Sequence, residues 1–258
     1  MISRSLDRRR GLDPDLEQQH TPEGVKLRLS RPPTVSYLRD FVYGAIDGAV
    51  TTFAVVAGAA GAGLESRIVV IMGLANLLAD GFSMAVSNFL GTRAESQRKE
   101  VARRAEQRHV ELYPEGEREE VRQLFAAKGF EGDDLERAVE VITSDRERWV
   151  DMMMSEELGF SSEDGSATRS ALATFVAFLV IGAIPLLPFL VNLVFDDAVD
   201  EPFLVATVLT GVAFALVGLL KARVVRQSLW RGTVETMALG GAAAGLAYLV
   251  GVLLQGIG

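Results

Sequence analysis

Five apolar segments, each long enough to cross a bilayer, limit what this chain can fold into more than any other feature. They cover about residues 41–63, 68–91, 170–194, 203–220 and 233–256. A membrane-spanning helix needs about 20 mostly apolar residues, because the hydrocarbon core of a bilayer is about 30 Å thick. The sequence therefore predicts an all-α protein with five transmembrane helices.

The charged residues are concentrated between the second and third of these spans. Residues 92–166 hold 20 Asp and Glu against 12 Lys and Arg, and the rest of the 258-residue chain balances at 14 against 14. Such an acidic block argues against a nucleic-acid partner and fits a domain that handles cations. We predict four parts: a mobile N-terminal tail (1–36), spans 1 and 2 (37–91), an acidic, helical, metal-binding insert (92–166), and spans 3 to 5 (167–258).

Glycine and proline divide the insert into helices. The helix of the second span is predicted to continue to the residue before Pro114, since no glycine or proline follows Gly91 and a residue before proline avoids helical geometry. Two further helices are predicted over 115–128 and 133–144. A last segment, DRERWVDMMMSEELGF, ends at Gly159.

The distribution of Lys and Arg near the span ends predicts the topology, because cytoplasmic loops carry the excess of basic residues. The tail carries Arg28, Arg31 and Arg39, and the connection KARVVRQSLWR between spans 4 and 5 is also basic. The connection FDDAVDEP between spans 3 and 4 has no basic residue. We predict a cytoplasmic N-terminus and insert, and an external C-terminus. The Arg-rich start, which lacks the apolar region of a signal peptide, favours a bacterial inner (plasma) membrane.

Two carboxylates stand inside the predicted spans, although a charge near the bilayer centre costs about 2.5–3.5 kcal/mol. Asp47 lies between Gly44 and Gly48, and Asp80 shares a helix face with Met84, four residues later. A methionine alone is more often core filler, and an acid between small residues can pair with a neighbouring helix. We predict that Asp47, Asp80 and Met84 line one metal pathway, at a dimer axis where the two glycines allow close approach.

The insert contains three groups of side chains that can ligate metals. They are Glu106 with His109, Glu117 with Glu120, and the run Met152, Met153 and Met154 before Glu156 and Glu157. Residues three apart share a helix face, although each Glu pair alone is more often a solvated surface. The methionines could instead form a hydrophobic cap beneath Trp149. The chain has no cysteine, so the available donors are carboxylate, imidazole and thioether, which suit Mn(II) and Fe(II).

Taken together, these stretches resemble the vacuolar iron transporter family. The matching stretches are DGAVTTFAVVAG in span 1, DGFSMAVSNFL in span 2, the acidic insert, and RWVDMMMSEELGF at its end. The resemblance covers about residues 37–256. It implies a homodimer of five-span subunits that exports Fe(II), and often Mn(II), from the cytoplasm in exchange for protons. It implies Asp47 and Met84 as pathway residues. It also implies a cytoplasmic metal site formed by Glu106, Glu117, Glu120, Met153, Met154 and Glu157.

Two positions depart from the pattern of that family. His109 stands where the insert commonly has another Glu, and Asn76 stands where span 2 commonly has an acid. Because Asn76, Asp80 and Met84 are spaced by four, we predict that the carboxylate has moved one turn along the same helix face. The predicted insert ligands are thus the family set together with His109. Such donors also accept Co(II) and Zn(II).

The sequence contains no Walker or nucleotide-binding motif, and its two histidines form no catalytic arrangement with Ser and Asp. We therefore predict a transporter and not an enzyme, driven by protons that buried carboxylates exchange for metal. A membrane-anchored iron-storage or ferroxidase protein is the alternative, suggested by Glu106-x-x-His109, although di-iron bundles use two such units. A purely structural membrane protein would leave Asp47 and Asp80 without a role.

Overall fold

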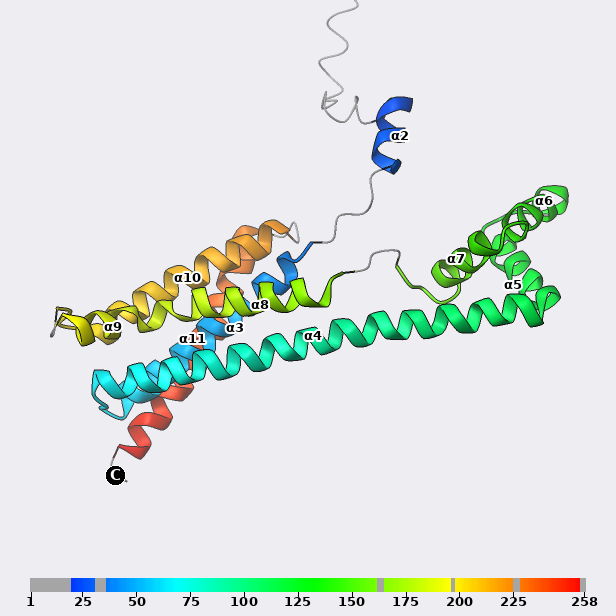
Figure 1. The fold of residues 1–258 in the computed structure, drawn as a ribbon. Coiled ribbons are helices and arrows are strands. Elements are labelled where there is room, and N and C mark those ends of the chain that lie inside the picture. The colour runs from blue at the N-terminus through cyan, green and yellow to red at the C-terminus, as the bar shows by residue number, and fades with distance from the viewer. Residues whose placement is uncertain (1–19, 31–35, 162–164, 196–197, 225–227, 256–258) are drawn as a thin grey trace, which may run out of the picture. The chain divides into compact units, whose positions relative to one another are not determined.

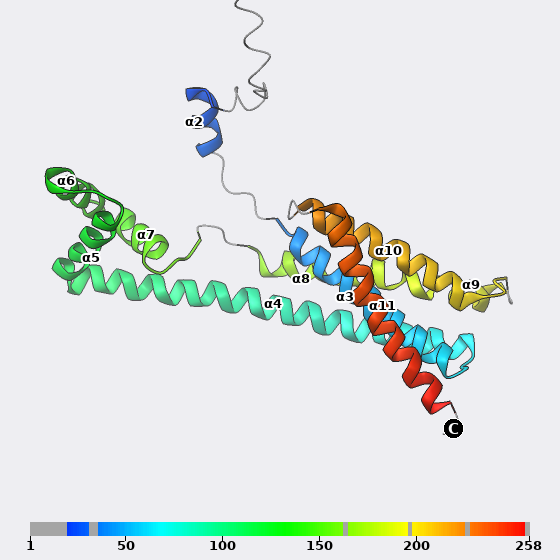
Figure 2. The same ribbon diagram turned by 180° about the vertical axis from the view of Figure 1, so that it is seen from behind.

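In the computed structural model, residues 20–30, 36–161, 165–195, 198–224 and 228–255 are described, and all regular structure within them is helical (Figures 1 and 2). The predicted all-α class is therefore confirmed. The chain divides into two units, Met1–Val35 and Ser36–Gly258.

The first unit contains a helix that the sequence analysis did not predict, α2 (Pro22–Ser30). Its start is local: Pro22 occupies the first turn, and the Thr21 hydroxyl accepts a hydrogen bond from the Gly24 N–H at 3.1 Å. No residue of α2 is buried, so apolar periodicity gave no signal for it. The mobile tail was predicted over residues 1–36, of which 1–19 and 31–35 lie outside the described residues, and its mobility stays a prediction.

Five helical segments of the second unit are long and apolar enough to cross a membrane, which confirms the predicted spans. They are α3 (Leu38–Gly61), α4 (Ser66–Leu112), the broken span α8 (Ala167–Gly182) to α9 (Leu187–Val194), α10 (Pro202–Val224) and α11 (Leu229–Leu254). The break in the third span, occupied by the 3-10 helix η3 (Ile184–Leu186), was not predicted. It coincides with Pro185 and Pro188, which lack the backbone N–H that a continuous helix needs.

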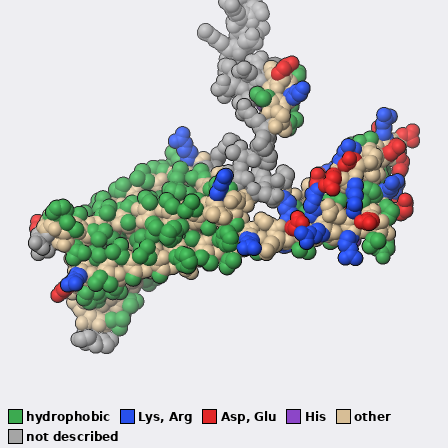
Figure 3. Space-filling view, in the orientation of Figure 1, with side chains coloured by type: hydrophobic (Ala, Val, Ile, Leu, Met, Phe, Trp, Pro, Cys, Tyr) green, Lys and Arg blue, Asp and Glu red, His purple; other side chains and the backbone are tan. Residues whose placement is uncertain are grey.

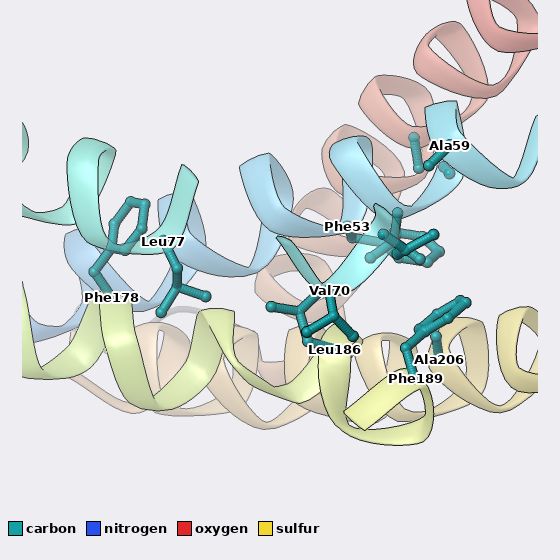
Figure 4. Packing of buried hydrophobic residues seen from close by; sticks show 12 residues of the cluster. Phe53, Ala59, Val70, Leu77, Phe178, Leu186, Phe189 and Ala206 are labelled. Atoms are coloured by element: carbon teal, nitrogen blue, oxygen red, sulfur yellow. The ribbon is translucent and has the colours of Figure 1, made fainter. Parts of the chain in front are cut away.

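The apolar core of the spans forms where α3 contacts α4, α8, α10 and α11. Phe53, Leu77, Phe178 and Leu186 all lie in this core, and Phe178 and Leu186 are fully buried (Figure 4). Between membrane spans, such packing is stabilised by van der Waals contacts and not by removal of apolar surface from water. The core therefore fixes α3, which carries Asp47, against α4, which carries Asp80 and Met84.

Gly44 and Gly48 pack inside the subunit, which corrects our placement of them at a dimer axis. A Cβ at Gly44 would lie 2.3 Å from the carbonyl oxygen of Thr174, and one at Gly48 would lie 2.5 Å from that of Phe178. Both carbonyls belong to α8, so the two glycines allow α3 and α8 to touch along their backbones. The error arose because a pair of small residues indicates a close helix contact without indicating its partner.

Helix α4 extends well beyond the span, because it runs unbroken for 47 residues, about 70 Å at the usual helical rise. It ends at Leu112, before Pro114, as predicted. The rest of the insert forms α5 (Pro114–Ala127), α6 (Gly132–Thr143) and α7 (Arg146–Glu156), gathered at the far end of α4 (Figures 1 and 2).

A separate small core holds the insert together. It includes Val121, Val150 and Met153, all fully buried, together with Trp149. In Figure 3 the charged side chains gather over α5–α7, whereas the visible surface of the span helices is largely hydrophobic. The two regions of the second unit thus have the surfaces expected of a solvated helical insert and of membrane spans.

Candidate functional site

The insert brings three of the predicted ligands together. Glu106 and His109 lie one turn apart on α4, and the turn at Pro114 folds α5 back so that Glu117 faces them. The His109 Nδ1 atom lies 3.8 Å from Glu106 Oε2 and 3.7 Å from Glu117 Oε1. One ligand atom from each residue fits within a group whose members are all less than 4.8 Å apart. This spacing suits a single bound cation.

The two carboxylates of this cluster are buried, which a cation would explain. Glu106 is 4% exposed and Glu117 is 6% exposed. Glu106 Oε1 and Glu117 Oε2 are buried without a hydrogen-bond partner in the part of the chain that the structure describes. Buried polar atoms are nearly always satisfied, since an unpaired one costs about 1–3 kcal/mol. A divalent cation between Glu106 and Glu117 would satisfy both oxygens.

The surroundings of the cluster raise the pKa of its two carboxyl groups. Burial raises the pKa of Glu117 to about 7, and a hydrogen bond to Glu106 and the charges of Glu106 and Glu120 add to the effect, while His109 opposes it. Desolvation also raises the pKa of Glu157, and the charges of Glu120 and Glu117 raise it further. Glu120 and Glu157 therefore share the field of the central cluster. Metal binding at these carboxylates would release protons near neutral pH.

The two predicted methionine ligands lie in the core of the insert. Met153 is fully buried and Met154 is 4% exposed, in the same cluster as Trp149. This packing is the hydrophobic alternative considered for the methionine run. Their role as thioether ligands stays a prediction.

The three predicted pathway residues line one cavity of about 1050 Å³. Asp47 enters it from α3, and Asp80 and Met84 enter it from α4. Asn76 is not among the described residues that line the cavity. Its Nδ2 atom is buried and has no hydrogen-bond partner among the described residues. That the carboxylate has moved from position 76 to position 80 stays a prediction. A site with two carboxylates and one thioether has the donors for a transition-metal ion.

The sequence analysis missed a polar junction in the wall of the same cavity. The side-chain amide of Asn88 donates hydrogen bonds to Asp40 Oδ1 at 3.2 Å and to Thr174 Oγ1 at 2.7 Å. These contacts join α4 to α3 and α8 across 48 and 86 residues of sequence, so spacing alone does not reveal them. One signal was available: Asn88 lies four residues after Met84 and so continues the Asp80–Met84 face of α4.

The fold and the two sites define a class of protein: a multi-pass helical membrane protein that carries acidic groups both within its spans and in an insert between them. The model of the VIT family matches residues 38–252, and the chain belongs to this family.

Named relatives agree with this assignment over most of their length. The chain is 32% identical to a vacuolar iron transporter of Toxoplasma gondii over 97% of this chain and 82% of that protein. It is 30% identical to vacuolar iron transporter 1 of Arabidopsis thaliana, over 84% of this chain and 86% of that protein. A vacuolar iron transporter of Plasmodium falciparum is also 30% identical, over 84% and 82%. The chain is therefore a metal-ion transporter and not an enzyme.

Proposed function

We propose that this protein exports Fe(II) from the cytoplasm in exchange for protons and accepts Mn(II) as a second substrate. The relatives named above are iron transporters, which supports iron as the substrate. The observation that carries the proposal is the Glu106–His109–Glu117 cluster, whose two buried carboxylates lack partners for one oxygen each. Carboxylate and imidazole donors accept both Fe(II) and Mn(II), and the same set also admits Co(II) and Zn(II).

Proton exchange follows from the chemistry of the two sites. Burial raises the pKa of Glu117 to about 7, so this carboxyl takes up a proton more readily than an ordinary Glu. A metal ion that binds there displaces that proton, since only the carboxylate coordinates. In the cavity, Asp47 and Asp80 can likewise be neutralised by a metal ion or by protons. Alternation between these two states would couple metal movement in one direction to proton movement in the other.

We further propose an orientation of the chain in the membrane and a homodimeric assembly. The basic span ends support a cytoplasmic N-terminus and insert, and the Arg-rich segment near the N-terminus supports a bacterial inner membrane. As a homodimer, two copies would meet on the exposed apolar side of α4. Ile71, Leu78 and Phe82, which are 60%, 60% and 64% exposed, lie there, on the side of α4 opposite Asp80.

Flux in proteoliposomes tests the transport function. The pure protein should carry Fe(II) under anaerobic conditions down its gradient, and a pH-sensitive dye on the other side should report counterflow of protons. Asp47→Asn should abolish the flux while the protein stays folded. Asp200→Asn is the matched control, because Asp200 is an exposed acid in the connection between α9 and α10. Metal flux without proton movement would refute exchange.

The storage or ferroxidase alternative predicts a different result. A ferroxidase consumes oxygen in proportion to Fe(II) in detergent solution, with no membrane gradient. The sequence has a second Glu-x-x-His unit, Glu17 to His20, but Glu17 lies outside the described residues. Oxygen consumption at the rate of iron disappearance, without flux, would favour this alternative.

A further inference from the structure

The two metal sites are far apart along one helix, and the charge between them is unfavourable for a cation. Met84 and Glu106 are 22 residues apart on α4, about 33 Å at the usual rise. Residues 92–105, which lie between them, hold five Lys and Arg against two Glu. A divalent cation that leaves the insert must therefore pass a basic stretch before it reaches the cavity.

Helix α7 lies along this stretch and neutralises part of it. The Arg103 guanidinium on α4 forms ion pairs with Glu147 at 2.7 Å and with Asp151 at 2.6 Å, both on α7. Arg98, further toward the span, forms an ion pair with Glu95 at 2.8 Å. The two Arg103 pairs direct α7 so that its C-terminal end, with Met154 and then Glu157, points toward the span end of α4.

Phe160 connects that end of α7 to the cavity. Its backbone N–H donates a hydrogen bond to the Met154 carbonyl at 2.9 Å, and its ring packs against the core of the insert. The Arg98 guanidinium lies over the ring, 5.0 Å from its centre. Phe160 and Arg98 both line the cavity that holds Asp47. The pair thus belongs to the insert and to the mouth of the cavity at once.

We propose that Arg98 and Phe160 form a positioning contact that holds the ligand-bearing end of α7 at the mouth of the cavity, so that metal passes from the insert to Asp47 without crossing open solvent. The contact also covers one face of the Arg98 guanidinium with an aromatic ring, beside the path that the cation takes. This inference rests on the proposed transport function and adds a route between its two sites.

Equilibrium Mn(II) binding reports metal capture by the insert, whereas Mn(II) flux also reports transfer to the cavity. Phe160→Ala should leave equilibrium Mn(II) binding by the full-length protein unchanged, since Phe160 ligates no metal. The Mn(II) concentration for half-maximal flux should rise about five-fold, which corresponds to about 1 kcal/mol, the usual worth of a cation–π contact. Phe160→Tyr keeps the ring and should restore the wild-type value. Arg98→Gln, which leaves the core of the insert intact, should reproduce the Phe160→Ala value.

Phe125→Ala is the matched control. Phe125 also packs against the core of the insert and also has a cation near its ring, with Lys128 Nζ 5.8 Å from the centre, but it does not line the cavity. Its loss should leave the flux curve unchanged. The positioning contact is refuted if Phe160→Ala behaves like Phe125→Ala, or if its flux and its Mn(II) binding fall together. Absence of Mn(II) and Fe(II) flux in the wild-type protein would instead refute the proposed function itself.

Discussion

Replacement of Glu117 by Gln should make the metal-free insert more stable at neutral pH. Glu117 is the buried carboxyl whose pKa is raised from its ordinary value of 4.5 to about 7. Because the folded-state value is the higher one, the folded insert binds more protons than the unfolded chain between these two pH values. Its contribution to stability is therefore complete below the unfolded pKa and is lost as pH rises through about 7.

The size of the effect follows from the shift. A difference of about 2.5 pKa units, at about 1.36 kcal/mol each, gives a ceiling of about 3 kcal/mol on the stability lost between acid and neutral pH. Glutamine cannot ionise, so Glu117→Gln should remove most of this loss. It also replaces one of the two close carboxylates, Glu106 and Glu117, with a neutral group that can donate a hydrogen bond to the other.

The fluorescence of Trp149 offers a direct assay. This residue is 4% exposed in the core of the insert, and the only other tryptophan, Trp230, is 77% exposed on α11. In a Trp230→Phe background, denaturant unfolding of the full-length protein in detergent should report the insert alone. The parent should lose stability from about pH 5 to about pH 8, and the Glu117→Gln variant should lose much less.

Glu119→Gln controls for the removal of a charge from the same helix. Hydrogen bonds to Gln123 and Arg122 lower the pKa of Glu119, so its contribution has the opposite sign and is lost as pH falls. This variant should keep the loss of stability at high pH. An equal pH dependence in the parent and in Glu117→Gln would refute the buried, proton-holding carboxyl. Added Mn(II) should stabilise the parent most at high pH, where its ligands are free of protons.

Three further predictions concern other parts of the molecule. Asp80→Asn should stop Fe(II) flux, and adding Asn76→Asp to it should restore part of the flux if the carboxylate has moved along α4; no recovery would refute the move. Mn(II) affinity of the full-length protein should fall as pH is lowered, less steeply in His109→Glu, because an imidazole must be neutral to coordinate; equal titrations would exclude His109 as a ligand. Gly48→Ala should lower the free energy of unfolding by about 1–3 kcal/mol, the usual cost of overpacking, and with it the thermal unfolding temperature, whereas Gly241→Ala, which meets open space, should not.

The parts of the fold set by local patterns could be predicted from the sequence. Five apolar runs gave five spans, and the absence of a helix breaker after Gly91 gave the long extension of α4. Single residues caused the local errors. Pro185 and Pro188 interrupt a run whose hydropathy is continuous, and α2 starts from a cap that no apolar stripe accompanies.

The parts set by pairing between distant segments could not be predicted. The Gly44 and Gly48 pair signalled a close contact, but only the packed helices show that α8 is the partner. Asn88 drew no attention, because its two side-chain partners lie on other helices. Asp47, Asp80 and Met84 do share one cavity, yet nothing in their spacing relates α3 to α4.

Because α4 is uninterrupted, the helical rotation between Met84 and Glu106 sets the angle between the two proposed metal sites. At about 100° per residue, the 22 steps from Met84 to Glu106 bring the two side chains to within about 40° of one another around the axis. One residue inserted between them would turn the whole insert by about 100° and face its ligands away from the cavity. Seven inserted residues would nearly restore the angle while adding about 10 Å of distance. The number of residues in α4 should therefore matter for transport. Length variants of α4 that still transport metal should differ from it in steps of seven or eleven residues.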